Sequence, residues 1–350
     1  MSGLRVCRSI LGALLAVALM VGEASACTRC LHRFADGRVI VGRSMDWMED
    51  PSSEIWCFPR GMKRHGNAGP ESLTWTSKYG SVGVSFYGVA SVDGMNEKGL
   101  VANTLYLAES DYGKPLAGRP NLSIGGWAQY VLDSFATVAE AVEELKKEPF
   151  TVRAPILPNG EPGVGHLAIS DASGDSAILE YLAGRLVIHH GRDYTVMTNS
   201  PPYDQQLALD AYWKQIGGDV MLPGTIRASD RFVRARYYID SIPDDATDVR
   251  AIASVFSVIR NASAPLGIST PGKPNIASTI WRTVHDQKER VLYFDSATSP
   301  TVFWISLEQL DFSAGAAVKR LPLTGGENYH GDASGDFVPA AAFLFLEAKP

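Results

Sequence analysis

Cys27 is the residue of this sequence whose position best suits chemistry. An apolar run over residues 10–21 precedes the small residues 24–26, Ala-Ser-Ala, and this order is typical of a secretory signal peptide. Cleavage after Ala26 would leave Cys27 at the new N-terminus. A thiol and a free α-amine on one residue form a compact catalytic unit, because the pKa of such an amine, about 7.7–8.0, allows it to accept the thiol proton.

Arg43 and Asp46 are the charged residues that we expect beside Cys27. Two β-rich runs, residues 28–34 and 39–43, flank an Asp-Gly turn, which predicts a hairpin. The hairpin brings Arg43 back toward Cys27, where a guanidinium favours the thiolate. Asp46 follows three residues later and is placed to orient the amine.

Two other interpretations of Cys27 remain open. Bacterial lipoproteins also begin with a cysteine after a small residue, although their signal normally has a large aliphatic residue where this chain has Ala24. Alternatively, export exposes thiols to an oxidising compartment in which disulfides form. After signal removal the odd number of cysteines leaves one unpaired, and we favour a Cys30–Cys57 disulfide that leaves Cys27 free.

Composition excludes several function classes. The 350 residues carry 32 basic and 38 acidic side chains, a net charge of -6, whereas nucleic-acid-binding proteins present a basic face. The sequence contains no HExxH, paired CxxC, Walker or dinucleotide-binding motif, and its histidines are scattered, so we predict neither a metal nor a cofactor. No run after the signal peptide reaches the length of a membrane span, so we predict a periplasmic or secreted protein without a membrane segment.

Hydrophobic periodicity predicts the elements that position these residues. Strands are predicted where β-rich or alternating runs are bounded by turns. They cover residues 28–34, 39–43, 81–87, 100–107, 167–170, 177–183, 186–190, 195–198, 280–285, 291–294 and 302–306. We interpret the four runs from 167 to 198 as consecutive antiparallel strands. Helices are predicted where apolar residues recur at helical spacing, over residues 125–147, 205–216, 228–242 and 248–259. Strands and helices do not alternate strictly, which argues against a doubly wound parallel sheet. We predict an α+β fold in which two antiparallel sheets pack face to face beneath helices, formed by residues 27–350 as one domain.

Five short motifs, in chain order, resemble the choloylglycine hydrolase family. They are Cys-Thr at 27–28, Gly-Arg-Ser-Met-Asp-Trp at 42–47, Gly-Met-Asn-Glu-Lys-Gly-Leu at 94–100, Thr-Asn-Ser-Pro at 198–201, and Leu-Pro-Gly at 222–224 followed by Ser-Asp-Arg-Phe-Val-Arg at 229–234. The family groups penicillin V acylases with conjugated bile acid hydrolases among the N-terminal nucleophile hydrolases. The resemblance implies a four-layer αββα sandwich and the hydrolysis of linear amides other than peptides.

The resemblance also implies roles for the residues that match the motifs. Cys27 is implied as the nucleophile and its own amine as the base, flanked by Arg43 and Asp46. Asn199 is implied to donate its side-chain amide to the oxyanion, and Arg231 to complete the polar network. Loss of one oxyanion donor typically costs about 2.7–4 kcal/mol in the barrier.

Tyr106 and Trp47 bear on the substrate. Tyr106 stands where bile salt hydrolases tend to carry Asn and penicillin V acylases tend to carry Tyr, and its backbone N–H is implied as the second oxyanion donor. Trp47 and Trp56 are candidate walls of an apolar acyl pocket, although large aromatic residues more often belong to a hydrophobic core, which is the interpretation that we favour for both. The resemblance ranks penicillin V-type amides first, N-acyl homoserine lactones (the targets of quorum quenching) as an overlapping class, and conjugated bile acids third.

Oligomeric state and an alternative class stay open. The interval between Asn199 and Arg231 is shorter than in many family members, where this segment helps to assemble a tetramer, so a homotetramer is one of the states left open. If an enzyme, the protein has a small-molecule amide as its partner. The alternative of another class is a non-catalytic periplasmic lipoprotein or binding module that is lipidated at Cys27.

Overall fold

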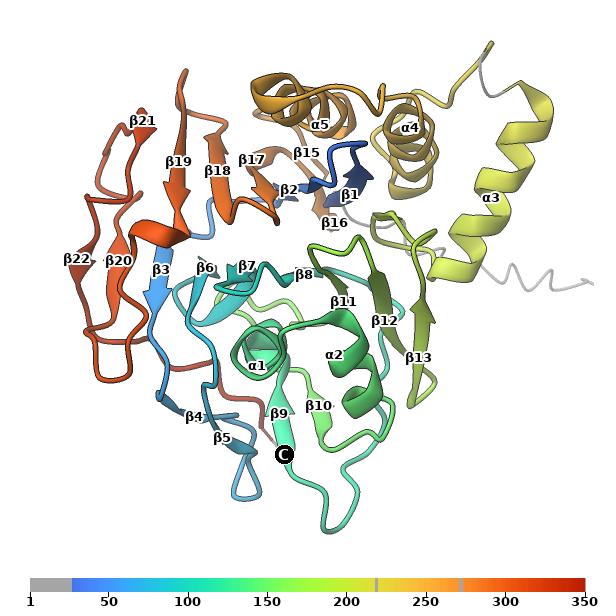
Figure 1. Ribbon diagram of the computed structural model, residues 1–350. Helices are drawn as coiled ribbons and strands as arrows, with labels where there is room; N and C mark the ends of the chain where they lie inside the picture. Colours follow the sequence, from blue (N-terminus) through green and yellow to red (C-terminus); the bar gives the residue numbers. More distant parts are fainter. Residues whose placement is uncertain (1–26, 218–219, 271–272, 350) are drawn as a thin grey trace, which may run out of the picture.

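Two large β-sheets stacked face to face form the centre of the molecule (Figure 1). The computed structural model describes residues 27–217, 220–270 and 273–349, and the predicted signal peptide, residues 1–26, lies outside the described residues. Within these ranges the first sheet has the strand order β14 (Val196–Met197), β1 (Thr28–Arg33), β2 (Val39–Asp46), β17 (Thr279–Asp286), β18 (Val291–Ser296), β19 (Val302–Ser306) and β21 (Gly331–Asp332). Its pairs are antiparallel except β19 with β21.

The second sheet is antiparallel throughout. Its order is β13 (Arg185–His190), β12 (Ser176–Leu182), β11 (His166–Ser170), β8 (Val101–Leu105), β7 (Ala90–Asn96), β6 (Ser81–Phe86), β3 (Ile55–Phe58), β20 (Lys319–Leu321) and β22 (Val338–Pro339). Three short two-stranded pairs lie outside the large sheets: β4 (Lys63–His65) with β5 (Thr74–Thr76), β9 (Asn121–Ser123) with β10 (Thr151–Arg153), and β15 (Ser269–Thr270) with β16 (Lys273–Ala277).

Helices cover the outer face of each sheet. The helices α4 (Ala228–Asp240) and α5 (Asp248–Ala262) pack on β1 and β2, and α3 (Tyr203–Ile216) lies beside α4 (Figure 1). On the other side, η1 (Ile124–Gly126), α1 (Trp127–Ser134) and α2 (Val138–Leu145) cover the second sheet, and a short helix η2 (Leu307–Gln309) follows β19. The predicted α+β, four-layer αββα sandwich is therefore confirmed.

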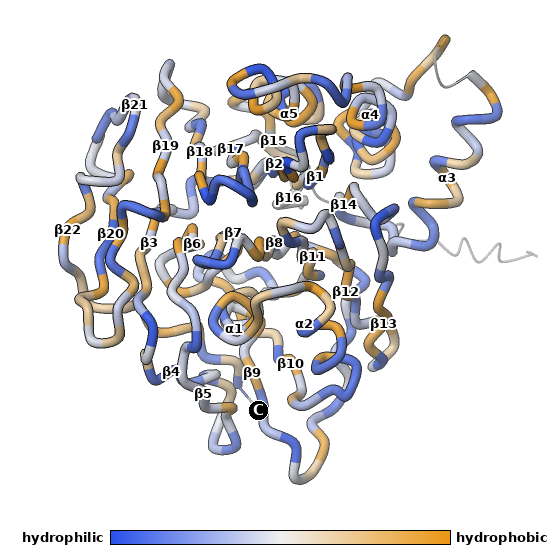
Figure 2. Tube along the Cα trace, viewed as in Figure 1, coloured by the Kyte–Doolittle hydropathy of each residue, from blue (hydrophilic) through white to orange (hydrophobic). Residues whose placement is uncertain are grey.

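Side chains point alternately to the two faces of each strand, and this alternation explains why the sheets and helices stack in layers. On β8, Val101 and Leu105 belong to the hydrophobic cluster between the sheets, whereas Ala102 belongs to the cluster beneath α1 and α2. Successive side chains of a strand point to opposite faces, so a strand with apolar residues on both faces must be covered on both sides. Hydrophobic residues accordingly recur along the strands of both sheets and on α1 (Figure 2).

Gly42 allows α5 to approach the sheet that carries the candidate site. A Cβ at Gly42 would lie 2.7 Å from Cγ1 of Ile259 and 2.8 Å from Cγ1 of Val255, which is closer than packed atoms allow. Close packing of α5 on β2 therefore requires the glycine of the Gly-Arg-Ser-Met-Asp-Trp motif, because a larger residue would push the helix away from the strand.

The predicted helix over residues 125–147 is broken in the middle. Helix α1 ends at Ser134, Phe135 is extended, and α2 begins after Thr137, whose hydroxyl accepts the backbone N–H of Glu140 at 3.2 Å. Glu140 in turn accepts the backbone N–H of Ala136 at 2.9 Å. The Thr-x-x-Glu sequence is that of a capping box, although Glu140 accepts the N–H one residue before the N-cap, and it marks a helix start that periodicity alone overlooks.

The strand predicted over residues 195–198 is not a fourth neighbour of β11, β12 and β13. Residues 196–197 form β14, which crosses to the first sheet and pairs with β1. Strand β7 was not predicted, and its residues complete the centre of the second sheet. The crossing at β14 matters for the site, since it carries Asn199 to the start of β1.

The predicted Cys30–Cys57 disulfide is wrong. Both cysteines are buried free thiols, and they lie in different sheets. Cys30 on β1 pairs with Val196 and Gly42, whereas Cys57 on β3 pairs with Val82 and Lys319. The prediction rested on the number of cysteines and an oxidising compartment, neither of which says which strands are neighbours, and β1 and β3 belong to different sheets.

Candidate active site

Cys27 lies directly before β1 and beside the end of β2. The predicted hairpin is confirmed, with Thr28 opposite Ser44, and the backbone N–H of Thr28 donates to the Ser44 hydroxyl at 3.2 Å. This register brings the Cys27 Sγ to 3.8 Å from the carbonyl oxygen of Asp46 and 3.9 Å from the Met45 Sδ. The side chain is buried, with 4 % of its surface exposed.

Asn199 joins Cys27 to the second sheet. Its Oδ1 accepts the Cys27 N–H at 2.7 Å, and its Nδ2 donates to the backbone carbonyl of Tyr106 at 2.6 Å. The two contacts fix which end of the amide carries the oxygen, because the nitrogen of Cys27 donates and the carbonyl of Tyr106 accepts. One N–H of the Asn199 side chain is engaged by Tyr106, and an amide nitrogen carries a second N–H that can make a further hydrogen bond.

Arg231 on α4 completes this cluster beneath the start of β1. Its guanidinium donates to the Cys27 carbonyl at 2.8 Å, to Asn199 Oδ1 at 3.0 Å and to the Thr28 hydroxyl. Burial lowers the pKa of Arg231 to about 10, opposed by the nearby Asp46 carboxylate, so the group remains a cation at neutral pH. The structure thus places Arg231 beside Cys27 and Asn199, in the polar network that the family resemblance implies for it.

Asp46 is a fully buried carboxyl at the end of β2. Its oxygens accept the Thr279 hydroxyl at 2.5 Å and the Ser44 hydroxyl at 3.4 Å. Burial raises the pKa of Asp46 to about 6, and the Arg231 guanidinium opposes this rise. At neutral pH the carboxylate is ionised, at a cost that its hydrogen bonds offset only in part.

Arg43 spans the gap between the two sheets. It lies on β2, and its guanidinium donates to the carbonyl oxygens of Val92 and Thr104, each at 3.0 Å. The carboxylate of Asp93 lies 3.8 Å away, and the guanidinium stands over the Trp281 ring at 4.8 Å. These contacts hold the charge of Arg43 in the wall of the pocket that contains Cys27.

The surroundings of Cys27 keep its thiol protonated at rest. Burial raises the pKa of the Cys27 thiol; the Arg43 guanidinium lowers it, and the Asp46 carboxylate raises it again. A raised pKa means that a nucleophilic attack from this sulfur requires a base that removes the proton during the reaction.

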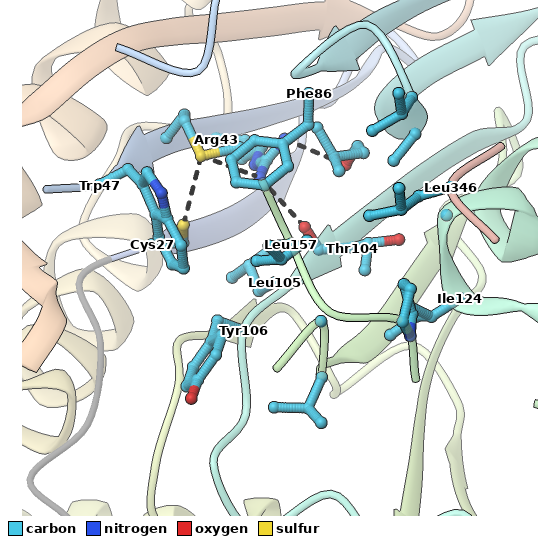
Figure 3. A pocket seen from close by; sticks show the side chains of 18 residues that line it. Cys27, Arg43, Trp47, Phe86, Thr104, Leu105, Tyr106, Ile124, Leu157 and Leu346 are labelled. Carbon is cyan, nitrogen blue, oxygen red and sulfur yellow. Dashed lines mark hydrogen bonds between the residues drawn. The ribbon is translucent and has the colours of Figure 1, made fainter. Parts of the chain in front are cut away.

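An apolar pocket opens from Cys27 into the space between the sheets. Its cavity volume is about 70 Å³. Figure 3 shows Cys27 and Trp47 at one end and Ile124 and Leu346 at the other. Its lining is mostly aliphatic and aromatic and comprises Cys27, Arg43, Met45, Trp47, Phe86, Val89, Ala90, Val92, Thr104, Leu105, Tyr106, Ile124, Gly125, Pro155, Leu157, Gly163, Val164 and Leu346.

Trp47 and Tyr106 line the pocket near Cys27, and Trp47 also belongs to the buried hydrophobic core. Their rings lie 5.8 Å apart, and the Trp47 indole donates to the Tyr87 hydroxyl at 2.9 Å. Trp56, the other candidate wall, belongs instead to the core, where its ring stacks on Phe58 at 6.0 Å.

His166 and Glu180 are functional candidates that the sequence did not single out. The His166 Nε2 donates to the Thr198 carbonyl at 2.8 Å, and its Nδ1 contacts a Glu180 oxygen at 2.8 Å. The other Glu180 oxygen accepts the backbone N–H of Tyr203 at 3.0 Å. This buried pair therefore fixes the chain on both sides of Asn199, from residues that no local pattern connects to it.

Asp93 forms a second buried polar group behind Arg43. It accepts from His285 Nε2 at 2.7 Å, from Asn103 at 3.1 Å and from the Thr283 hydroxyl. Although burial raises the pKa of Asp93, His285 and Arg43 bring it below the ordinary value.

Among residues 27–217, 220–270 and 273–349, no group of three or more His, Cys, Asp or Glu side chains is arranged to hold a metal ion. Within the same ranges no helix is long and apolar enough to span a membrane.

The fold and this site define the class of protein. The αββα sandwich holds a cysteine at the end of an apolar pocket, and comparisons with known proteins assign the chain to the amide C–N hydrolases. The chain belongs to the choloylglycine hydrolase family, whose model, described as linear amide C–N hydrolases, matches residues 27–319. The resemblance inferred from the five motifs is confirmed, and so is hydrolysis of linear amides (EC 3.5.1).

Individual relatives are similar over most of the chain. A penicillin V acylase of Pectobacterium atrosepticum is 50% identical over 97% of this chain and 97% of its own length. The solved penicillin V acylase of Agrobacterium tumefaciens is 54% identical with a TM-score of 0.85, covering 91% of this chain and 99% of that one. A bile salt hydrolase/transferase of Clostridium perfringens is 27% identical over 69% of this chain and 80% of its own.

A more distant structure agrees on the fold. A conjugated bile acid hydrolase variant from Clostridium perfringens is 23% identical, with a TM-score of 0.73 over 87% of this chain and 98% of that one. It supports the same fold of two sheets between helical layers.

Proposed function

We propose that this protein is an exported acylase that cleaves an apolar acyl group from a small polar amine, with Cys27 as its mature N-terminus. One observation carries the proposal: the nitrogen of Cys27 lies 2.7 Å from Asn199 Oδ1 at the end of an apolar pocket. Removal of residues 1–26 converts this nitrogen into an α-amine beside its own thiol. The family match, which begins at residue 27, supports this maturation site.

The reaction runs in two steps. The amine takes the thiol proton while Sγ forms a bond to the amide carbonyl carbon, and the second N–H of Asn199 and the backbone N–H near Tyr106 stabilise the oxyanion. The C–N bond then breaks, and the amine passes the proton to the leaving nitrogen. Water attacks the remaining thioester, releases the carboxylic acid and restores the thiol.

Charged groups around Cys27 serve this cycle without touching the scissile bond. Arg43 lowers the pKa of the thiol and therefore favours the thiolate that forms during attack. Arg231 holds both the Cys27 carbonyl and Asn199 Oδ1, which keeps the nitrogen, the sulfur and the oxyanion donor in one arrangement. Asp46 balances the charge of Arg231.

Penicillin V-type amides are the substrate class that we rank first. The pocket beyond Cys27 is lined by apolar side chains, which suits an aryl or alkyl acyl group, and two relatives at 50% and 54% identity are named penicillin V acylases. N-acyl homoserine lactones have the same design, an apolar acyl chain joined by an amide to a small polar ring, so we propose them as an overlapping class with a quorum-quenching role. Conjugated bile acids rank third, on the more distant relative.

Two measurements test the proposal. Mass spectrometry of the purified mature protein should find a chain that begins with free Cys27; a diacylglyceryl group on Cys27 would instead support a lipoprotein anchor. The mature protein should hydrolyse phenoxyacetyl and fatty-acyl amides faster than bile acid amides. A precursor with an intact Ala26–Cys27 bond should be inactive, because an amide nitrogen cannot accept the thiol proton, and full activity of that precursor contradicts the mechanism.

A further inference from the structure

The far end of the pocket is closed by the C-terminal segment, residues 343–348. Leu346 lines the pocket together with Ile124 and Val89, at the end opposite Cys27 (Figure 3). Leu346 lies beyond residue 319, where the match to the family model ends. A residue outside the matched range therefore completes the surface that an acyl group would meet.

The backbone of the segment is fixed on both sides of Leu346. The Leu346 N–H donates to the Val89 carbonyl at 2.8 Å, and the Ser123 hydroxyl donates to the Leu346 carbonyl at 2.7 Å. The Ala348 N–H donates to the Asn67 carbonyl at 3.0 Å. Val89 borders the pocket and Ser123 directly precedes its residue Ile124, so these bonds tie Leu346 to the same elements that form the end of the pocket.

Phe345 anchors the segment next to Leu346. Its ring is 4 % exposed and stacks on Trp75 at 6.1 Å. A Cβ on Gly126 would lie only 3.0 Å from Cδ2 of Phe345, so the absence of a side chain at Gly126 makes room for this ring beside η1. The anchor prevents Leu346 from moving away when the pocket fills, because the neighbouring aromatic side chain is held in the core.

We propose that Leu346 is a specificity-determining residue that sets the longest acyl chain this enzyme accepts. The inference rests on the proposed function, in which the acyl group enters the pocket with its carbonyl at Cys27. The terminal carbons of the chain then meet Leu346 and Ile124. Each additional buried methylene raises kcat/KM about fourfold until the chain reaches Leu346, and longer chains lose this gain.

The test is a chain-length profile of kcat/KM for N-acyl amides of one amine, from butanoyl to dodecanoyl. Leu346→Ala removes three carbons from the end wall, so its maximum should move to a longer chain, with the dodecanoyl-to-hexanoyl ratio rising about tenfold. Leu346→Trp should move the maximum to a shorter chain. Leu344→Ala is the matched control, because Leu344 belongs to the same segment, is 77% exposed and should keep the wild-type profile.

Thermal unfolding of each variant separates specificity from stability. If Leu346→Trp does not fold, Leu346→Ala still decides the question. Wild-type profiles for both Leu346 variants would overturn this inference while leaving the proposed function intact. A wild-type enzyme that hydrolyses phenoxyacetyl amides but none of the series would overturn the inference alone, and one that hydrolyses neither would overturn the proposed function as well.

Discussion

The two ends of the pocket are built from different kinds of contact. Around Cys27 the chain buries Arg43, Arg231 and the carboxylate of Asp46, and each of these groups is held by hydrogen bonds of 2.5–3.4 Å. Around Leu346 the walls are aliphatic side chains that are fixed mainly through their backbone. A substitution that breaks a buried hydrogen bond leaves the partner group unsatisfied, which costs free energy even when the change in the side chain is small. A substitution in an apolar wall changes the free energy of burial in proportion to the apolar area removed.

This contrast predicts abrupt losses at one end and graded shifts at the other. A substitution beside Cys27 leaves a buried donor or charge without its partner, so its cost falls on kcat. A substitution at the far end changes how much of the acyl chain is buried, so its effect depends on the substrate. The following predictions run from the largest expected effect to the smallest.

Replacing the nucleophile tests the polar end most severely. Cys27→Ala should reduce kcat by about 10⁴-fold or more, because no other described side chain of the pocket offers a nucleophile at this position. The measurement is steady-state hydrolysis of a phenoxyacetyl amide by the mature variant. The control is its melting temperature, which should stay close to that of the wild type; an active Cys27→Ala variant contradicts the assigned role.

Asn199→Ala should reduce kcat by about 10²–10³-fold, since the oxyanion loses a donor and the Cys27 nitrogen loses its acceptor. KM should change much less, because the acyl group binds in the apolar part of the pocket. The matched control is Asn328→Ala, which removes an exposed asparagine and should leave both constants unchanged. A rise in KM at constant kcat would assign Asn199 to substrate binding instead.

Asp46 gives the polar end a pH dependence that the apolar end lacks. Burial raises its pKa to about 6 from the usual 3.8, so between these values the native state keeps a proton that the unfolded state releases. The free energy of unfolding should therefore fall as the pH rises through this window, by about 3 kcal/mol in total, and this contribution should level off above pH 6.

Asp46→Asn should flatten this slope, since an amide does not titrate. Denaturant unfolding at several pH values between the two pKa values measures it for both proteins. Asp245→Asn, which changes an exposed carboxyl, serves as the control and should keep the wild-type slope. Equal slopes in the wild type and Asp46→Asn would show that other groups control this region of the curve.

Tyr106→Phe should have the smallest effect, less than about threefold in kcat. Asn199 contacts the backbone carbonyl of Tyr106, and the ring packs against Trp47, so loss of the hydroxyl leaves both contacts in place. The measurement is kcat/KM for phenoxyacetyl and fatty-acyl amides. A loss of tenfold or more would show that the hydroxyl itself contacts the substrate and that the polar end extends further into the pocket.

Local patterns predicted much of the fold because local contacts create them. The hairpin at residues 28–43, the three helices α3, α4 and α5, and the strands β17, β18 and β19 lie where periodicity and turns place them. The prediction failed where long-range packing decides the outcome. Residues 195–198 look like a continuation of β13, yet the chain crosses to pair with β1, and no signal within the segment identifies its partner.

The residues of the candidate site also divide into those that the sequence predicted and those that only the structure identified. Cys27, Arg43, Asp46, Asn199 and Arg231 were each found from motifs, and the hydrogen-bonding network then brings Cys27, Asn199 and Arg231 together. His166 carried no motif, because its importance comes from contacts with Thr198 and Glu180 on other elements.

The sequence alone determined the family and the layer order and predicted the polar residues around Cys27, because these follow from residue type and short spacing. Tertiary structure alone decided that Cys30 and Cys57 lie apart, that His166 holds the Asn199 segment, and that Leu346 meets Ile124 at the end of the pocket. Apolar packing is non-directional and has no sequence period across such separations. Only the folded chain shows which side chains close the cavity.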